Sequence, residues 1–148
     1  MMKKILIILI LILSNCGYQP LHLNKPNDLI FKEIELIGEN DINRRIISAL
    51  SIKKNDNEYS LKKIVLKSGK RIIETSRDTS GQPISFKMIL TLKITTINMN
   101  DIITEKEISK EFTYRNKENK FDLSEYEIDV QNNIIDRIIE ELIIHLKI

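Results

Sequence analysis

Cysteine is almost absent from this sequence: Cys16 is the only one, and tryptophan does not occur at all. One cysteine cannot form an intrachain disulfide or supply the several thiolates of a structural zinc site. Glycine is also scarce, with four residues, and no glycine-rich phosphate loop, G-x-S-x-G or H-E-x-x-H motif occurs. The two histidines, His22 and His145, stand without a second ligand at metal-binding spacing. The sequence therefore predicts no metal, no cofactor and no enzymatic activity.

An excess of charge of one sign is absent too. The chain has 23 lysines and arginines against 21 aspartates and glutamates. Residues 1–15 contain Lys3, Lys4 and no acid, so residues 16–148 hold 21 basic and 21 acidic side chains. A balanced chain has no general field that attracts nucleic acid. We therefore expect no nucleic-acid partner.

The most informative feature that is present is an apolar run near the start. Lys3 and Lys4 precede nine consecutive apolar residues, 5–13, and Ser14-Asn15-Cys16 follows. Nine residues suit the core of a signal peptide and are about half of the ~20 that a membrane-spanning helix needs. This arrangement is typical of a bacterial lipoprotein signal, in which the cysteine becomes the lipidated N-terminus. We expect residues 1–15 to be removed; the alternative is an uncleaved anchor, because Asn15 stands where a small residue is usual.

The rest of the chain divides into a tether and one domain. Residues 16–28 carry Pro20 and Pro26 among polar residues and are predicted to form a lipidated, extended tether. Residues 29–148 have the length of a single domain.

Hydrophobic periodicity predicts the elements of this domain. Alternation indicates strands at 29–37, 59–75, 84–97 and 102–114, with a break in the second at Ser68-Gly69, and helical spacing indicates helices at 41–52 and 124–146. Ser124 and Glu127 have the spacing of a capping box, which predicts that the last helix begins at Ser124. Two sets of residues are each expected on one strand face: Phe86, Met88, Leu90, Leu92 and Ile94, and Ile102, Ile108, Phe112 and Tyr114.

The predicted order is strand, helix, three strands, helix. The last two strands are unusually long, and the last helix matches them in length. The economical packing lays two helices on one face of a four-stranded sheet. The sequence therefore predicts an α+β fold with the order β-α-β-β-β-α.

The polar loop from Arg77 to Pro83 is the first place to look for an anion site. Arg71, Arg77 and Lys87 are expected to surround it, and guanidinium groups bind phosphate in forked geometry. The alternative is ordinary solvated loop charge. Three glutamates, Glu105, Glu107 and Glu111, alternate along a predicted strand and are expected on its solvent face rather than as a catalytic pair.

Several short stretches, taken in order, resemble the LPS-assembly lipoprotein family of the LptE type. The resemblance covers nearly the whole chain and depends on the succession of weak signals. The stretches are Cys16-Gly17-Tyr18-Gln19-Pro20-Leu21, Asn43-Arg44-Arg45, Gly81-Gln82 before Ser85-Phe86-Lys87-Met88-Ile89-Leu90, Asp136-Arg137 and Glu140-Glu141-Leu142.

The resemblance implies an outer-membrane lipoprotein on the periplasmic side that plugs the β-barrel of its partner LptD. Together the two proteins insert lipopolysaccharide into the outer leaflet, and the lipoprotein is a structural and binding subunit rather than an enzyme. The resemblance also associates basic residues in the loop before the hairpin and just before the last helix with lipopolysaccharide contact. The corresponding positions here are Arg77 and Lys120. The alternative is a free-standing lipoprotein that binds a lipid or another apolar ligand between helices and sheet.

The position of Cys16 after the apolar run gives the first testable prediction. Cys16→Ser should leave the precursor unprocessed and unlabelled by fatty acid, because no other cysteine can accept the lipid. Metabolic labelling with palmitate measures this. Labelling that persists in the variant would show that the anchor is attached elsewhere.

Overall fold

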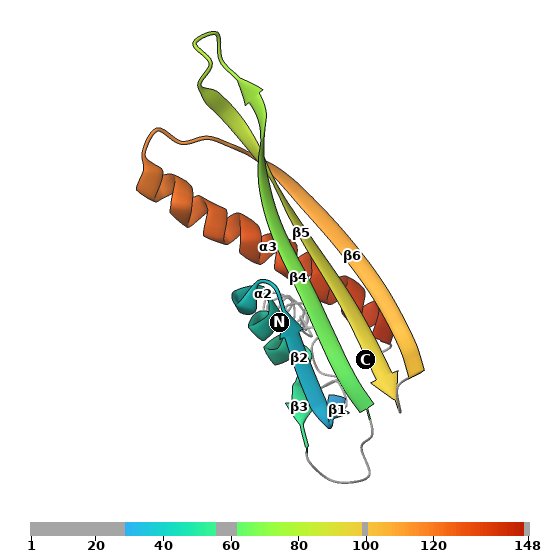
Figure 1. Cartoon of the computed structure of the whole chain (residues 1–148). Coiled ribbons are helices and arrows are strands. Elements are labelled where there is room, and N and C mark those ends of the chain that lie inside the picture. The colour runs from blue at the N-terminus through green and yellow to red at the C-terminus, as the bar shows by residue number, and fades with distance from the viewer. Residues whose placement is uncertain (1–28, 56–61, 99–100, 147–148) are drawn as a thin grey trace, which may run out of the picture.

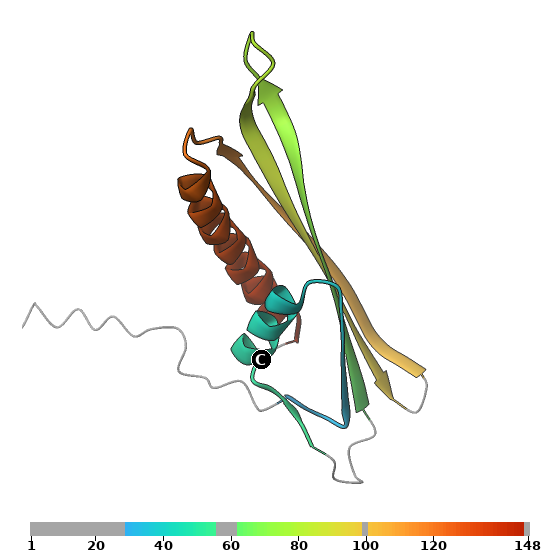
Figure 2. The ribbon, with the colours of Figure 1, turned by 60° about the vertical axis from the view of Figure 1, so that its left-hand side comes forward.

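The described chain forms a four-stranded sheet with two helices on one face, beside a small two-stranded sheet. The computed structural model describes residues 29–55, 62–98 and 101–146. Figures 1 and 2 show both helices on the same side of the large sheet. The predicted α+β class and the predicted packing are confirmed. The elements are β1 (Leu29–Phe31), β2 (Glu33–Ile37), α2 (Asn40–Ala49), β3 (Ile52–Lys54), β4 (Lys62–Arg77), β5 (Pro83–Asn98), β6 (Asp101–Arg115) and α3 (Lys120–Leu146).

The large sheet has the strand order β2-β4-β5-β6. β2 is parallel to β4, whereas β4, β5 and β6 are antiparallel to their neighbours. β4 runs unbroken through Ser68 and Gly69, so the break that the sequence suggested there does not occur. Because parallel neighbours need a crossover, α2 and β3 lie in the connection between β2 and β4.

Two predicted elements end differently from expectation. The predicted strand 29–37 is two strands, because Lys32 interrupts it and β1 pairs with β3 instead of joining the large sheet. The predicted helix 41–52 ends at Ala49, since Ser51 takes a φ of 50° and Ile52 begins β3. β1 and β3 have three residues each, which is too short for alternation to reveal them.

The core lies between the helices and the inner face of the sheet, which is the face that they cover. The predicted apolar face of β5 is confirmed, with Phe86 half-buried at its end and the other four residues buried. The buried residues of β5 and α3 are Met88, Leu90, Leu92, Ile94, Val130, Ile134, Ile135, Ile138 and Leu142. The outer face of the sheet, opposite the helices, has no helix against it in the described part of the chain (Figure 2).

The turn from β2 into α2 depends on one glycine. Gly38 has a φ of +88°, and a Cβ there would lie 1.9 Å from the carbonyl oxygen of Ser68. Asn43, which is fully buried, donates from Nδ2 to the carbonyl oxygen of Ile37 at 3.0 Å. Ser68 donates from Oγ to the carbonyl oxygen of Glu39 at 3.1 Å. These contacts hold the start of α2 against β2 and β4.

The last helix begins at Lys120, earlier than predicted. Asn119 caps it, because its Oδ1 accepts a hydrogen bond from the backbone N–H of Phe121 at 2.9 Å. The predicted capping box is wrong: Ser124 lies inside the helix, and Glu127 accepts a hydrogen bond from the hydroxyl of Tyr114 on β6. No helix in the described ranges is long and apolar enough to cross a membrane.

The predicted apolar face of β6 is only partly correct. Ile108 and Tyr114 are buried, whereas Ile102 is 63% and Phe112 is 37% exposed. The β5–β6 pairing is irregular between Thr96 and Ile97, next to the partner of Ile102. Since β6 is an edge strand, its ends receive less cover than those of β5.

Burial on α3 gives a stability prediction. Ile138 is 0% exposed, so Ile138→Asp should lower the free energy of unfolding by about 3 kcal/mol or more, because an unpaired carboxylate would face apolar neighbours. Ile144→Asp is the matched control on the same helix, because Ile144 is 78% exposed. Urea unfolding measures both variants. Equal midpoints for the two would contradict the described packing of α3.

Candidate functional site

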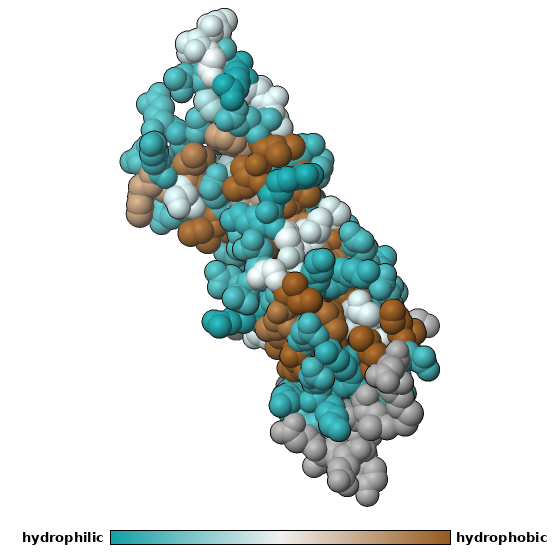
Figure 3. Space-filling model, viewed as in Figure 1, coloured by the Kyte–Doolittle hydropathy of each residue, from teal (hydrophilic) through white to brown (hydrophobic). Residues whose placement is uncertain are grey.

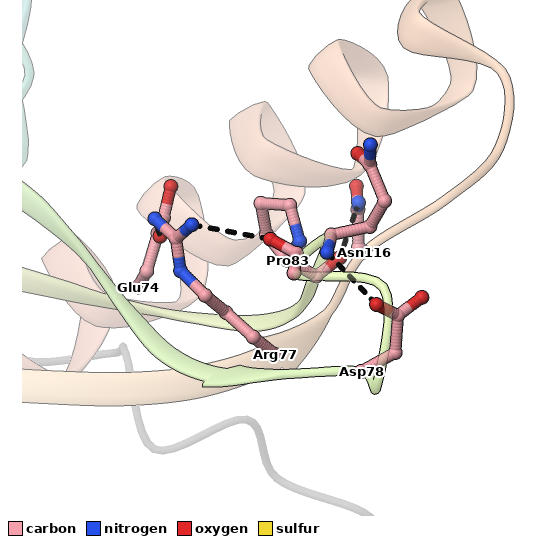
Figure 4. A network of polar contacts seen from close by, with 7 residues as sticks. Glu74, Arg77, Asp78, Pro83 and Asn116 are labelled. Carbon is pink, nitrogen blue, oxygen red and sulfur yellow. Dashed lines mark hydrogen bonds and ion pairs between the residues drawn. The ribbon is translucent and has the colours of Figure 1, made fainter.

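Arg77 ends β4 at the base of the loop that joins β4 to β5 (Figure 4). Its Nη1 donates to the carbonyl oxygen of Gly81 at 3.1 Å, and its Nη2 forms an ion pair with Glu74. Residues three apart on a regular strand face opposite sides, but the pairing of β4 is irregular on both sides of Ser76, which lets the two meet. The side chain of Arg77 remains 60% exposed. The guanidinium is therefore accessible but already partnered.

Asp78 orders the loop that follows Arg77. Its Oδ1 accepts hydrogen bonds from the N–H of Ser80 at 2.9 Å, the hydroxyl of Ser80 at 2.7 Å and the N–H of Gln82 at 2.8 Å. The Ser80 hydroxyl, followed by the Gln82 backbone, holds the pKa of the Asp78 carboxyl below its usual value. Gly81 has a φ of +86°, a conformation that glycine adopts without strain. The loop is thus shaped by its own side chains.

The connection from β6 to α3 lies against the base of this loop. Asn116 donates from its backbone N–H to the carbonyl oxygen of Ile84 at 2.7 Å and from Nδ2 to that of Pro83 at 2.8 Å. Figures 1 and 4 show both loops at the same end of the sheet. The structure therefore places Arg77, the last residue of β4, and Lys120, the first residue of α3, at the same end of the molecule, where Asn116 joins the two adjoining loops.

Lys120 and its neighbours add positive charge at this end. Lys120 is exposed, and the structure gives it no hydrogen bond or ion pair within the described residues. Arg115, at the end of β6, is exposed as well. Lys117 places Nζ 4.7 Å from the centroid of the Tyr126 ring. The family resemblance singled out Lys120 in this stretch but neither Arg115 nor Lys117, because the composition of a loop does not distinguish one of its cations from another.

The prediction that Arg71 and Lys87 surround the loop between β4 and β5 is wrong. Lys87 lies on the outer face of the sheet and pairs with Glu111 at 2.9 Å. Arg71 lies on the same face, directly opposite Ile89. The predicted solvent face of β6 is confirmed, since Glu105, Glu107 and Glu111 are all exposed.

Three stretches on which the family resemblance depends have structural roles here. Arg45 of α2 bonds to Asn132 and to Asp136 of α3, the latter at 2.8 Å. Glu141 of α3 forms ion pairs with two lysines of β6, Lys110 at 2.6 Å and Lys106 at 3.3 Å. These contacts hold the two helices together and α3 along β6.

Tyr114 fixes the start of α3 to β6. Its ring lies 5.9 Å from that of Tyr126, edge to face, and its hydroxyl donates to Oε1 of Glu127 at 2.6 Å. Burial raises the pKa of the Tyr114 phenol well above its usual value, and the bond to Glu127 acts in the same direction. This contact lies beside the loop that carries Lys117 and the start of α3, which carries Lys120.

One hollow between a helix and the sheet is a candidate site for an apolar ligand, but it is small. It lies between β6 and α3, has a volume of about 200 Å³ and is lined by Phe112, Tyr126, Asp129, Val130 and Asn133. Ligand sites usually have volumes of about 300 to 1,000 Å³. Within the described residues no three histidine, cysteine or acidic side chains come together to hold a metal.

No family model matches the sequence, and no curated protein matches it. Several solved structures share its fold, among them the following three. A minor lipoprotein from Acinetobacter baumannii has a TM-score of 0.56 at 12% identity, covering 77% of this chain and 89% of that one. A putative lipoprotein from Caulobacter crescentus has a TM-score of 0.53 at 10% identity, and the match covers 76% of this chain and 86% of that one. An uncharacterized lipoprotein B from Nitrosomonas europaea has a TM-score of 0.52 at 11% identity, and the match covers 78% of this chain and 83% of that one.

The chain therefore has a fold that is found in bacterial lipoproteins. All three neighbours are described as lipoproteins, and none of their descriptions names an enzyme. Cys16 and the predicted tether lie outside the described residues, so the lipid anchor stays a prediction.

The Tyr114 contact predicts a pH dependence. Because the folded state holds the phenolic proton more tightly, the stabilisation by Tyr114 is present below the usual pKa of 10.0 and is lost as the pH rises beyond it. Tyr114→Phe should lower the free energy of unfolding by about 1 kcal/mol at pH 7. This difference in the free energy of unfolding between variant and parent should shrink above a pH of about 10. Urea unfolding from pH 7 to 11 measures the difference, and a constant value would contradict this ionisation behaviour.

Proposed function

We propose that this chain is an outer-membrane lipoprotein of the LptE type, anchored through Cys16 and facing the periplasm. It occupies and supports the barrel of an LptD-type partner and helps to assemble lipopolysaccharide into the outer leaflet. The observation that carries the proposal is the fold, which the chain shares with three bacterial lipoproteins. The predicted lipoprotein signal before Cys16 supports the same class independently.

The outer face of the sheet supports a role as a plug. Its strands alternate lysine, glutamate, threonine and serine with a few aliphatic residues, and no described helix covers them. The lumen of an outer-membrane barrel is polar, so such a face can lie against its wall without burying unpaired groups. A carrier of apolar ligands would instead need a larger hollow than the 200 Å³ between β6 and α3.

Co-purification tests the role as partner of a barrel. The tagged full-length chain, extracted from outer membranes with mild detergent, should bring down an LptD-type β-barrel in a stoichiometric complex. The alternative, a free-standing lipoprotein, predicts that the chain is recovered alone and stays stable in cells depleted of the barrel. Recovery without a barrel would overturn the proposal.

Arg77 and Lys120, at the end of the molecule where the β4–β5 loop lies, give a prediction for the binding of lipopolysaccharide. Arg77→Glu combined with Lys120→Glu should weaken binding of lipopolysaccharide to the lipid-free protein by about tenfold or more, because a charge-assisted bond to phosphate contributes about 1.5 to 3 kcal/mol. Glu74→Gln should strengthen binding, since it releases Arg77 from its ion pair.

The matched control is the pair Arg44→Glu and Arg137→Glu. Both arginines are exposed helical residues for which the structure records no ion pair among the parts it describes. Titration with purified lipopolysaccharide measures the dissociation constants of the parent, the two double variants and Glu74→Gln. Equal affinities in the two double variants would leave Arg77 and Lys120 as ordinary surface charges.

A further inference from the structure

The outer face of the large sheet carries a hollow at a glycine of β4. The hollow has a volume of about 300 Å³ and is lined by Gly69, Lys70, Arg71, Ile89 and Thr91. Gly69 creates it, because a Cβ at this position would lie 2.9 Å from Oγ1 of Thr91. Glycine in the interior of a strand weakens the sheet and often marks a place where another group approaches closely. The hollow is therefore a feature with a cost in stability.

Positive charge surrounds this hollow without compensation. Lys67 and Arg71 flank Gly69 on the same face of β4, and both are exposed. Across all the segments described, neither has an ion pair or a side-chain hydrogen bond. Lys67 stands directly opposite Lys93 of β5, and like charges in this position are destabilising. Only Lys93 is paired, with Glu105 at 2.8 Å. Such an arrangement favours the arrival of a negative group.

We propose that the hollow at Gly69 receives a carboxylate of a protein partner that docks on the outer face of the sheet. Aliphatic side chains lie beside the cations: Val65 and Ile89 are half-buried and Ile73 is 39% exposed. Figure 3, which views this face, shows apolar side chains gathered in patches with a hydrophilic band between them. Arginine among aliphatic groups is typical of the centre of a protein interface.

A protein fits this surface better than a free anion. Exposed cations bind a small anion weakly, because water and salt screen the attraction. A docked protein surface excludes water and thereby strengthens the same ion pair. The face is also polarised across its strands, with Lys67 and Arg71 on β4 and Glu107 and Glu111 on β6. The complementary partner surface is acidic over β4 and basic over β6.

The identity of this partner rests on the proposed function, in which it is the LptD-type barrel. The experiment uses the full-length lipidated chain expressed with that barrel. Arg71→Glu removes the central cation, and Gly69→Val fills the hollow with a residue that suits a strand. Arg137→Glu is the matched control, because Arg137 is an exposed arginine of α3, on the opposite side of the sheet. A photo-reactive p-benzoylphenylalanine at Ile89 reports which molecule lies over the hollow.

We expect the parent and Arg137→Glu to recover the barrel equally. Arg71→Glu and Gly69→Val should each recover about tenfold less at physiological salt, with unchanged circular dichroism. The probe at Ile89 should cross-link to the barrel. If Gly69→Val fails to fold, Arg71→Glu and the cross-link decide the question.

Two results would overturn this inference while leaving the proposed function intact. One is full recovery of the barrel with Arg71→Glu together with the absence of a barrel cross-link from Ile89. The other is a dimer of the purified chain in sedimentation that Arg71→Glu dissociates, which would assign the face to a second copy. If the parent itself recovers no barrel, the proposed function fails first.

Discussion

The burial of one face of β5 against α3 is the interaction on which the rest of the structure depends. Met88, Leu90, Leu92 and Ile94 are between 0 and 2% exposed, and Ile138 of α3 is buried against the same cluster. Each such side chain contributes about 1.5 to 3 kcal/mol when it leaves water. β5 also pairs with β4 from Pro83 to Asn98 on one side and with β6 from Ser85 to Asn98 on the other. A slip of one residue would turn the apolar set outward, so this burial fixes the register of three strands at once.

The same constraint determines the composition of the outer face. Once alternate residues of β5 are committed to the core, Lys87, Ile89, Thr91 and Lys93 must point away from the helices. Their cross-strand partners follow, which brings Lys87 to Glu111 and Lys93 to Glu105. These exposed ion pairs add little to stability. The outer face is consequently available for function, because its ion pairs contribute little to the stability of the domain.

The parts of the fold that the sequence predicts are those with strong and long periodicity. β5 and α3 offer many repeats of their patterns, so their apolar faces could be assigned from spacing alone. β1 and β3 offer three residues each, and their pairing joins segments that are distant in sequence. The start of α3 was misplaced because two capping residues compete, and Asn119 precedes Ser124. Local sequence signals therefore show where an element lies but do not determine the residue at which it begins or ends.

The candidate site was less predictable than the fold for a related reason. Arg77 could be singled out by its loop, but its ion pair with Glu74 depends on an irregular stretch of β4 that no spacing rule reveals. Asn116, which joins the two loops, bonds to backbone atoms of Pro83 and Ile84, and backbone acceptors leave no trace in sequence. Contacts between side chain and distant backbone are thus the part of a site that only the structure supplies.

The edges of the sheet explain why we propose its outer face, rather than an edge strand, as the surface for a partner. β6 is an edge strand of 15 residues, and a long open edge invites pairing with other chains. Its exposed edge is protected by charge: Lys106 and Lys110 reach across to Glu141 of α3 and hold the helix alongside. Charged side chains and a neighbouring helix both discourage the addition of another strand. A partner that does not extend the sheet can lie on its outer face, which no described helix covers and which contains the hollow at Gly69.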